Sequence, residues 1–232
     1  MRKIIAFVIA LTFCIASYSV PIKSMIGVKG QAFVAQPEDG FLPDGVIAVE
    51  YLESSGEQWI MTDLIFTESD DIDIEYHNVT SLDSTGRHLQ GWRTLGASYW
   101  GASNGKYDRL GATPRILCRE NDLVRIIRNG TPGAIDECII NGEINYQTSA
   151  FSKYGGRLVL FALDNGGSYS GSWRIGEIKV IVNGEMSAYY VPIRIINEDG
   201  VSEGAYYDIV SGKMLFNNVR STKPLIIGPD KE

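Results

Sequence analysis

Short apolar runs with a period of two constrain the fold of this chain more than any other feature of its sequence. Residues 71–78 read DIDIEYHN, in which acidic residues alternate with isoleucine and tyrosine. Successive side chains of a β-strand lie on opposite faces, so this run predicts a strand with one buried face. Residues 173–182 alternate in the same way, and residues 157–163 form a short apolar run. No stretch has the periodicity of an amphipathic helix, and the sequence therefore predicts an all-β fold.

Turn residues separate these runs. Asn129-Gly130 and Asn141-Gly142 predict two hairpins, because Asn and Gly accept the positive φ that such turns require. Residues 188–196 contain Pro192, which cannot donate to a hydrogen-bond ladder, so they predict an edge strand or a bent strand. About twelve strands at spacings of about ten residues predict a sandwich or a barrel.

The first 19 residues have the pattern of a secretory signal peptide. Arg2 and Lys3 precede an apolar run at residues 4–16, and Ser17 and Ser19 are small residues before the predicted cleavage site. An apolar run of this length is too short to cross a membrane core of about 30 Å as a helix. Segment 1–19 is therefore predicted to export the chain to the periplasm, the cell surface or the medium. No membrane insertion is expected after its removal.

Composition and charge characterise the chain that follows. Residues 20–44 combine prolines and glycines with little periodicity, which predicts a leader or linker before one β-sandwich domain at 45–232. The formal net charge is −7, and it becomes −9 once the signal, with its two basic and no acidic residues, is removed. An acidic chain without a basic cluster argues against binding to nucleic acid or to anionic membranes.

Two cysteines, Cys118 and Cys138, remain after signal removal. Disulfides are common in exported proteins. However, residues 115–119, 123–128 and 135–140 have the pattern of three consecutive strands, and the outer strands of such a meander lie roughly 9.5 Å apart. A disulfide needs Cα atoms within about 7 Å of each other. The sequence is therefore consistent with either a disulfide bridge between Cys118 and Cys138 or two buried thiols.

Aromatic residues gather among glycines in the middle of the chain and form the main candidate for a binding site. Sugar rings stack their C–H faces on Trp or Tyr, and their hydroxyls need polar partners, so this composition predicts a glycan or a surface protein as partner. Core packing is the alternative interpretation, and it is the expected one for Trp59 and Trp173, which lie in apolar strand contexts. The candidate ligand-binding residues are Trp92, Tyr99, Trp100, Asn104, Tyr107 and Asp108.

The acidic residues of the alternating run, Asp71, Asp73 and Glu75, are the candidates for catalysis. The two carboxyls of a retaining glycosidase stand about 5–5.5 Å apart, whereas positions i and i+4 of a flat strand are about 13 Å apart. The simpler interpretation is a row of acidic residues on the wet face of a half-buried strand.

Calcium is the one cofactor that the sequence leaves open. Asp164 and Asn165 offer oxygen ligands of the kind that calcium prefers, but Asp-Asn-Gly-Gly is also an ordinary turn sequence. The chain contains no His-Glu-x-x-His and no Cys-x-x-Cys motif that would predict a transition-metal site.

Phrases near both ends of the predicted domain are similar to those of one family. Residues 42–45 (LPDG) and 49–59 (VEYLESSGEQW) open the domain, and residues 175–183 (IGEIKVIVN), 207–213 (YDIVSGK) and 228–229 (GP) close it. They resemble the concanavalin A-like, or laminin-G-like, jelly-roll domains that bacteria and phages secrete. The resemblance implies a two-sheet antiparallel jelly-roll sandwich with a role in binding glycans or surfaces. It implies no particular set of ligand residues.

Three classes of function follow. The favoured hypothesis is an exported, non-catalytic recognition module for a glycan or a cell-surface partner. The second is a glycoside hydrolase or lyase of the same fold that uses Asp73 and Glu75. Residues 71–75 resemble the Glu-x-Asp-x-Glu strand of family 16 glycosidases, where one Glu is the nucleophile and the other the acid/base. The third is a structural module of an envelope assembly.

Overall fold

The computed structural model describes residues 42–82, 88–93, 97–103, 106–108, 119–148, 155–162, 170–197, 199–218, 220–221 and 223–232. Residues 88, 92–93, 97–103, 106–108 and 145–148 are described by their backbone alone. The predicted signal and nearly all of the predicted leader, up to residue 41, lie outside the described residues.

Within these residues the chain forms strands and turns and no helix, which confirms the all-β prediction. The strands are β1 (Ile47–Ala48), β2 (Leu52–Ser55), β3 (Ile60–Phe66), β4 (Ile72–Ser81), β5 (His88–Arg93), β6 (Ala97–Ser103), β7 (Lys106–Asp108), β8 (Asp122–Arg128), β9 (Asp136–Ile140), β10 (Glu143–Thr148), β11 (Gly156–Leu160), β12 (Ser172–Ile175), β13 (Ile178–Val182), β14 (Glu185–Ile196), β15 (Ser202–Asp208), β16 (Lys213–Phe216) and β17 (Ile226–Ile227).

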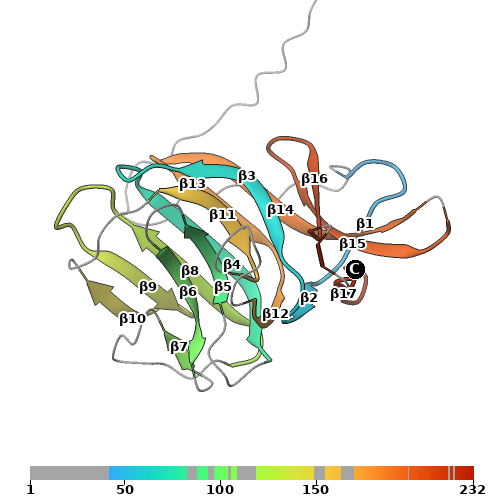
Figure 1. Ribbon diagram of the computed structural model, residues 1–232, viewed down its shortest axis with the longest axis horizontal. Coiled ribbons are helices and arrows are strands. Elements are labelled where there is room, and N and C mark those ends of the chain that lie inside the picture. Colours follow the sequence, from blue (N-terminus) through green and yellow to red (C-terminus); the bar gives the residue numbers. More distant parts are fainter. Residues whose placement is uncertain are drawn as a thin grey trace, which may run out of the picture. The chain divides into compact units, whose positions relative to one another are not determined.

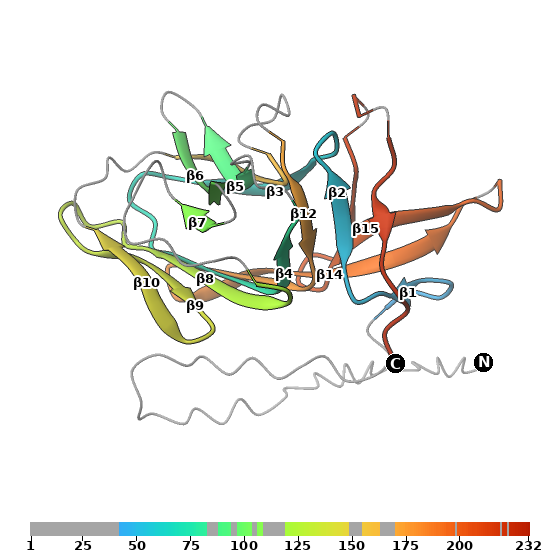
Figure 2. The same ribbon diagram turned by 90° about the horizontal axis from the view of Figure 1, so that it is seen from below.

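The strands build two antiparallel sheets of unequal size (Figure 1). The larger sheet has the order β10-β9-β8-β4-β13-β14-β15-β16, with β1 paired to β14, β12 paired to β2 and β4, and β17 paired to β2. The smaller sheet has the order β3-β11-β5-β6-β7. Figure 2 shows the smaller sheet as a separate layer across from β8, β4 and β14. The two layers together form a sandwich.

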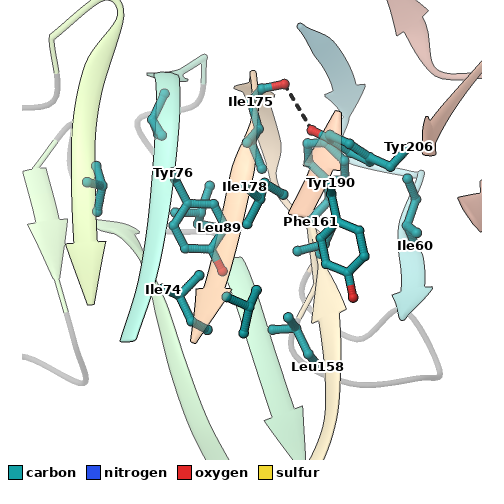
Figure 3. Close-up of a cluster of buried hydrophobic side chains, with 14 of the residues drawn as sticks. Ile60, Ile74, Tyr76, Leu89, Leu158, Phe161, Ile175, Ile178, Tyr190 and Tyr206 are labelled. Carbon is teal, nitrogen blue, oxygen red and sulfur yellow. Dashed lines mark hydrogen bonds between the residues drawn. The ribbon is translucent and has the colours of Figure 1, made fainter. Parts of the chain in front are cut away.

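Apolar side chains from both sheets pack in one cluster between them (Figure 3). In β4, the side chains of Ile72, Ile74 and Tyr76 are 0–1 % exposed, whereas the acidic residues between them are half-buried. Leu89 of β5 and Leu158 of β11 join them from the smaller sheet. Each such buried side chain contributes about 1.5–3 kcal/mol to stability. The half-buried strand predicted from the alternation at residues 71–78 is confirmed.

Strand β14 is buried on both faces. Tyr190 packs into the cluster between the sheets, while Tyr189, Val191 and Ile193 form a second cluster on the opposite face. Leu42, just before the first strand, packs against this second cluster. The start of the described chain thus covers part of the outer surface of the larger sheet.

Pro192 lies in the interior of the larger sheet, so the expected edge strand is wrong. Strand β14 pairs with β15 along one side. Along the other side its pairing with β13 ends at Tyr190, and its pairing with β1 begins at Ile193. The carbonyl of Pro192 accepts a hydrogen bond from Val49 N at 2.9 Å on that second side. Since N–H and C=O of one residue share a side in an antiparallel ladder, the missing N–H falls where β14 changes partner.

Two Asn-Gly turns close hairpins in the same way. Asn141 and Asn183 adopt φ values of 51° and 52°, between β9 and β10 and between β13 and β14. Each asparagine also caps a neighbouring strand: Asn141 Oδ1 accepts from Leu123 N at 2.8 Å, and Asn183 Oδ1 accepts from Asp71 N at 2.9 Å. The hairpin predicted at Asn141-Gly142 is confirmed.

The hairpin predicted at Asn129-Gly130 is present between β8 and β9, but the positive φ expected of its glycine is not. Strands β8 and β9 pair, and residues 129–135 connect them. Gly130 has no positive φ; instead its backbone packs so closely that an added Cβ would lie 1.9 Å from Ser69 O. The glycine is required by this contact with the loop between β3 and β4 rather than by a tight turn.

The sequence phrases at the two ends of the domain lie side by side. Strand β17 pairs with β2, and Gly228 N donates to Tyr51 O at 3.0 Å. In the closing phrase, Asp208 Oδ1 accepts from Tyr189 N at 3.0 Å and its Oδ2 accepts from Ser211 Oγ at 2.6 Å. These residues therefore hold turns and strand ends together.

Candidate functional site

The aromatic and glycine-rich residues predicted to bind a ligand fall on three neighbouring strands, β5, β6 and β7. Trp92 lies on β5, Tyr99 and Trp100 on β6, and Tyr107 and Asp108 on β7. Asn104 lies outside the described residues. The fold thus brings five of the six candidates into one part of the smaller sheet.

Cross-strand register divides these candidates between the two faces of that sheet. Gln90 is opposite both Leu160 of β11 and Trp100 of β6. Leu160 belongs to the cluster between the sheets, and directly opposed residues share a face. Trp100 therefore occupies a core-facing register position. Trp92, two residues from Gln90 on the same strand, shares that face.

Tyr99 occupies the outer face. It pairs with Gly91 of β5, and Gly91 in turn pairs with Val159 of β11. Val159 does not belong to the cluster between the sheets, which contains its neighbours on β11, but to a separate cluster. Asp108 is opposite Gly101, two residues from Tyr99, and so lies on the same outer face. Tyr107, opposite Ala102, falls on the core-facing side.

The outer face carries a small buried cluster of its own. Trp59, Val159 and Ala162 pack together there and are 7 %, 1 % and 0 % exposed. The expected burial of Trp59 is confirmed, as is that of Trp173, which is 1 % exposed. The indole Nε1 of Trp59 has no acceptor within the described part of the chain. The contact between Trp59 and Val159 is not predictable from the sequence, because the pairing of β3 with β11 joins distant segments.

The acidic residues of β4 are held in ion pairs on the outer face of the larger sheet. Asp73 accepts two hydrogen bonds from Arg125 of β8, the one from Nε at 2.8 Å. Glu75 Oε1 lies 2.8 Å from His77 Nε2 and 3.8 Å from Lys179 Nζ. Asp71 Oδ1 accepts from Gly130 N at 2.7 Å.

These contacts set the protonation state of Glu75. The hydrogen bond from His77 lowers the pKa of Glu75, and it outweighs the raising effect of partial burial; Lys179 adds to the lowering. A glycosidase acid must hold a proton at its working pH, which requires a raised pKa. The surroundings of Glu75 lower its pKa instead. The carboxylates of this row are therefore suited to neutralising the neighbouring cations.

A second charged group lies beside this row. Glu177 accepts a hydrogen bond from Tyr189 Oη at 2.5 Å and another from Lys231 Nζ. Burial raises the pKa of Glu177, but the two hydrogen bonds and the charge of Lys231 outweigh burial, so the pKa is lowered. The cation of Lys179 lies 5.4 Å from the centre of the Tyr189 ring. The face is therefore internally charge-compensated.

The described residues hold no cluster of three or more His, Cys, Asp or Glu side chains able to bind a metal ion. Asp164 and Asn165, the predicted calcium ligands, lie outside the described residues, as does Cys118. Cys138 is fully buried in the core, on β9 opposite Ile126.

Among the described residues, no helix has the length and apolar character needed to cross a membrane. A scan of the chain against models of protein families finds no match. A search among curated proteins also finds no matching relative.

Proposed function

We propose that this protein is an exported, non-catalytic recognition module that binds a glycan or a cell-surface partner. The pattern of residues 1–19 supports export. The aromatic and acidic residues on β5–β7 support recognition, because rigid sandwich sheets present such residues at fixed spacings.

We propose further that the sandwich is a jelly roll of the concanavalin A-like type. In support, the chain passes repeatedly between the layers: β3 lies in the smaller sheet, β4 in the larger, β5–β7 in the smaller, β8–β10 in the larger and β11 in the smaller. All of the strand pairs that the structure describes are antiparallel.

The observation that carries the choice of binding over catalysis is the environment of Glu75. Its pKa is lowered by His77, and neighbouring Asp73 is held by Arg125. A carboxylate that stays ionised and engaged in an ion pair is a poor general acid. The lowered pKa of Glu75 is the opposite of what the proton donor of the hydrolase hypothesis needs.

A glycan array and a reducing-sugar assay on the same protein sample test this proposal. We expect retention of at least one glycan, no release of reducing sugar, and unchanged binding by Glu75→Gln. Hydrolysis that Glu75→Gln abolishes would overturn the non-catalytic assignment. Absence of both binding and hydrolysis would favour the structural module instead.

A further inference from the structure

We infer that the outer face of strands β14, β15 and β16 is the contact surface of a symmetric dimer, in which it packs against the same face of a second copy of this chain. The inference goes beyond the proposed function and does not rest on it, because it uses the larger sheet and leaves β5–β7 of the smaller sheet free. Three properties of the face carry it: its apolar rows, its incomplete cover and its charge balance.

Two apolar rows cross the three strands on this face, and in each row one residue of β14 is opposite one of β15, which in turn is opposite one of β16. The rows are Ile193, Ala205 and Phe216, and Val191, Tyr207 and Met214. Directly opposed residues share a face. Ile193 and Ala205 lie in the buried cluster outside the larger sheet, so the rows extend that cluster to β16, the last strand in the sheet order.

The cover of this face does not reach β16. Val46 and Ala48 pack against the cluster beside β14, where β1 pairs with that strand. At the other end of the rows Phe216 is 40 % exposed, and Tyr207 and Met214 are only partly buried. Neighbouring exposed apolar side chains of this kind mark a contact surface on a soluble protein.

The charge balance of the outer face favours contact between two copies. Three carboxylates on the same side of the larger sheet are compensated by neighbouring cations: Asp73 by Arg125, Glu75 by Lys179 and Glu177 by Lys231. The two apolar rows contain no charged residue, although the chain carries a formal net charge of −7. Two copies of an acidic chain repel each other, and the repulsion is smallest where both present uncharged side chains.

The chemistry of the rows fits a second copy better than other classes of partner. A sugar needs several convergent hydrogen-bonding groups beside its apolar contacts, and Tyr207 carries the one polar side-chain group in the two rows. A strongly charged partner finds no opposite charge in the rows. A second copy presents the same apolar rows, and a two-fold axis brings them together in an isologous contact, the commonest form of soluble oligomer.

Sedimentation velocity of the full mature chain between about 1 and 100 µM tests the inference. We expect a species of twice the monomer mass whose share rises with concentration. Phe216→Glu and Met214→Glu each bring like charges together at the contact and should weaken the dimer about tenfold or more. Ile65→Glu is the matched control, because Ile65 is 63 % exposed on β3 of the smaller sheet; this variant should dimerise like the wild type. Circular dichroism verifies folding.

Two measurements on the wild type need no variant. An apolar contact between two acidic copies should be equally strong or stronger at higher salt, since salt screens the remaining repulsion. Hydrogen exchange followed by mass spectrometry should be slower in residues 205–216 at concentrations where the dimer forms than at concentrations where it dissociates.

A chain that stays monomeric over the whole range would overturn the inference. A dimer that both folded charge variants leave unchanged, or that Ile65→Glu dissociates, would place the contact elsewhere and overturn it as well. Weakening by salt would show a contact made by ion pairs, contrary to the apolar rows. If the charge variants do not fold, unchanged exchange in residues 205–216 is the contradicting result. None of these outcomes bears on the recognition function, which is tested by ligand binding.

Discussion

The imidazole Nε2 of His77 lies 2.8 Å from Oε1 of Glu75, two residues away on β4, so the two side chains share the outer face of the larger sheet. The contact makes Glu75 part of a structural ion-pair row with Lys179 and Arg125 nearby. It also links the stability of the sheet to pH, because the ionised form of Glu75 is favoured more strongly in the folded chain than in the unfolded chain.

Acid should therefore weaken the fold through Glu75. Its pKa in the folded chain is below the ordinary value of 4.5, so its stabilising contribution is complete above that value. The contribution is lost as the pH falls from about 4.5 through the lower folded value. Urea unfolding of the wild type and Glu75→Gln between pH 7 and pH 3 measures this. The stability difference between the two should shrink with acidification.

Glu143→Gln provides the control for the acid experiment, because Glu143 is exposed at the start of β10. Its stability difference from the wild type should stay nearly constant over the same range. A difference for Glu75→Gln that stays equally constant would show that the contact with His77 does not stabilise the fold.

Two buried tyrosines should respond differently to loss of the hydroxyl. Tyr206 and Tyr76 are both fully buried, but Tyr206 Oη donates to Ile175 O at 2.9 Å (Figure 3), whereas the Tyr76 hydroxyl has no partner within the described residues. Tyr206→Phe should cost about 1–2 kcal/mol, since it leaves a buried carbonyl with one bond fewer. Tyr76→Phe should be neutral or slightly stabilising, since it removes a buried unsatisfied group.

Denaturant unfolding of the two tyrosine variants gives the comparison directly, and each is the control for the other. Both changes remove one oxygen from a ring in the same core, so differences in packing are small. Equal losses in the two variants would mean that Tyr76 has a partner of comparable strength.

The half-buried strand β4 was predictable because its signal is local. Alternation over residues 71–78 is sufficient to place Ile72, Ile74 and Tyr76 inward, whatever the strand pairs with. The turn at Asn141-Gly142 was predictable for the same reason, since the positive φ that it requires is a property of two adjacent residues.

The faces of the aromatic residues were not predictable, because they depend on pairing between distant segments. The register of β5 with β6 shifts between His88 and Gln90, which inserts an additional residue. One residue more or less exchanges the two faces of a strand. Tyr99 and Trp100 are adjacent in the sequence but fall on opposite faces of the sheet. Their proximity in the sequence therefore does not place them on one surface.

Pro192 and Gly130 show how tertiary contacts override local rules. The rule that proline prefers edge strands is sound, but a central strand tolerates Pro192 where β13 ends and β1 has not begun. Gly130 fits a two-residue turn in sequence, but the glycine is used for its contact with Ser69. The residues adjacent in the sequence to Pro192 and Gly130 do not indicate which distant strands or loops contact them.

Gly130→Ala should destabilise the protein more than its loop position indicates. An added Cβ would lie 1.9 Å from Ser69 O and 2.3 Å from Ser69 C, both backbone atoms that cannot rotate away. Overpacking of this kind costs about 1–3 kcal/mol. The shift would also disturb the hydrogen bond from Gly130 N to Asp71. Thermal unfolding compared with Thr131→Ala, a change at the exposed next residue, gives the test; a loss no larger than that of the control would contradict the close contact.

Asp208 should be the most sensitive polar residue of the closing phrase. It is 6 % exposed, and its Oδ1 accepts from Tyr189 N at 3.0 Å and Val210 N at 3.1 Å, which joins β14 to the turn between β15 and β16. Asp208→Ala leaves the buried N–H of Tyr189 without a partner, at a cost of about 1–3 kcal/mol, and also removes the acceptor of the half-buried Val210 N–H. Ser211→Ala, which removes only the hydroxyl bond to Oδ2, should cost about 1 kcal/mol. Urea unfolding of the two variants should therefore rank Asp208→Ala well below Ser211→Ala in stability, and the reverse order would show that the carboxylate does not hold this turn.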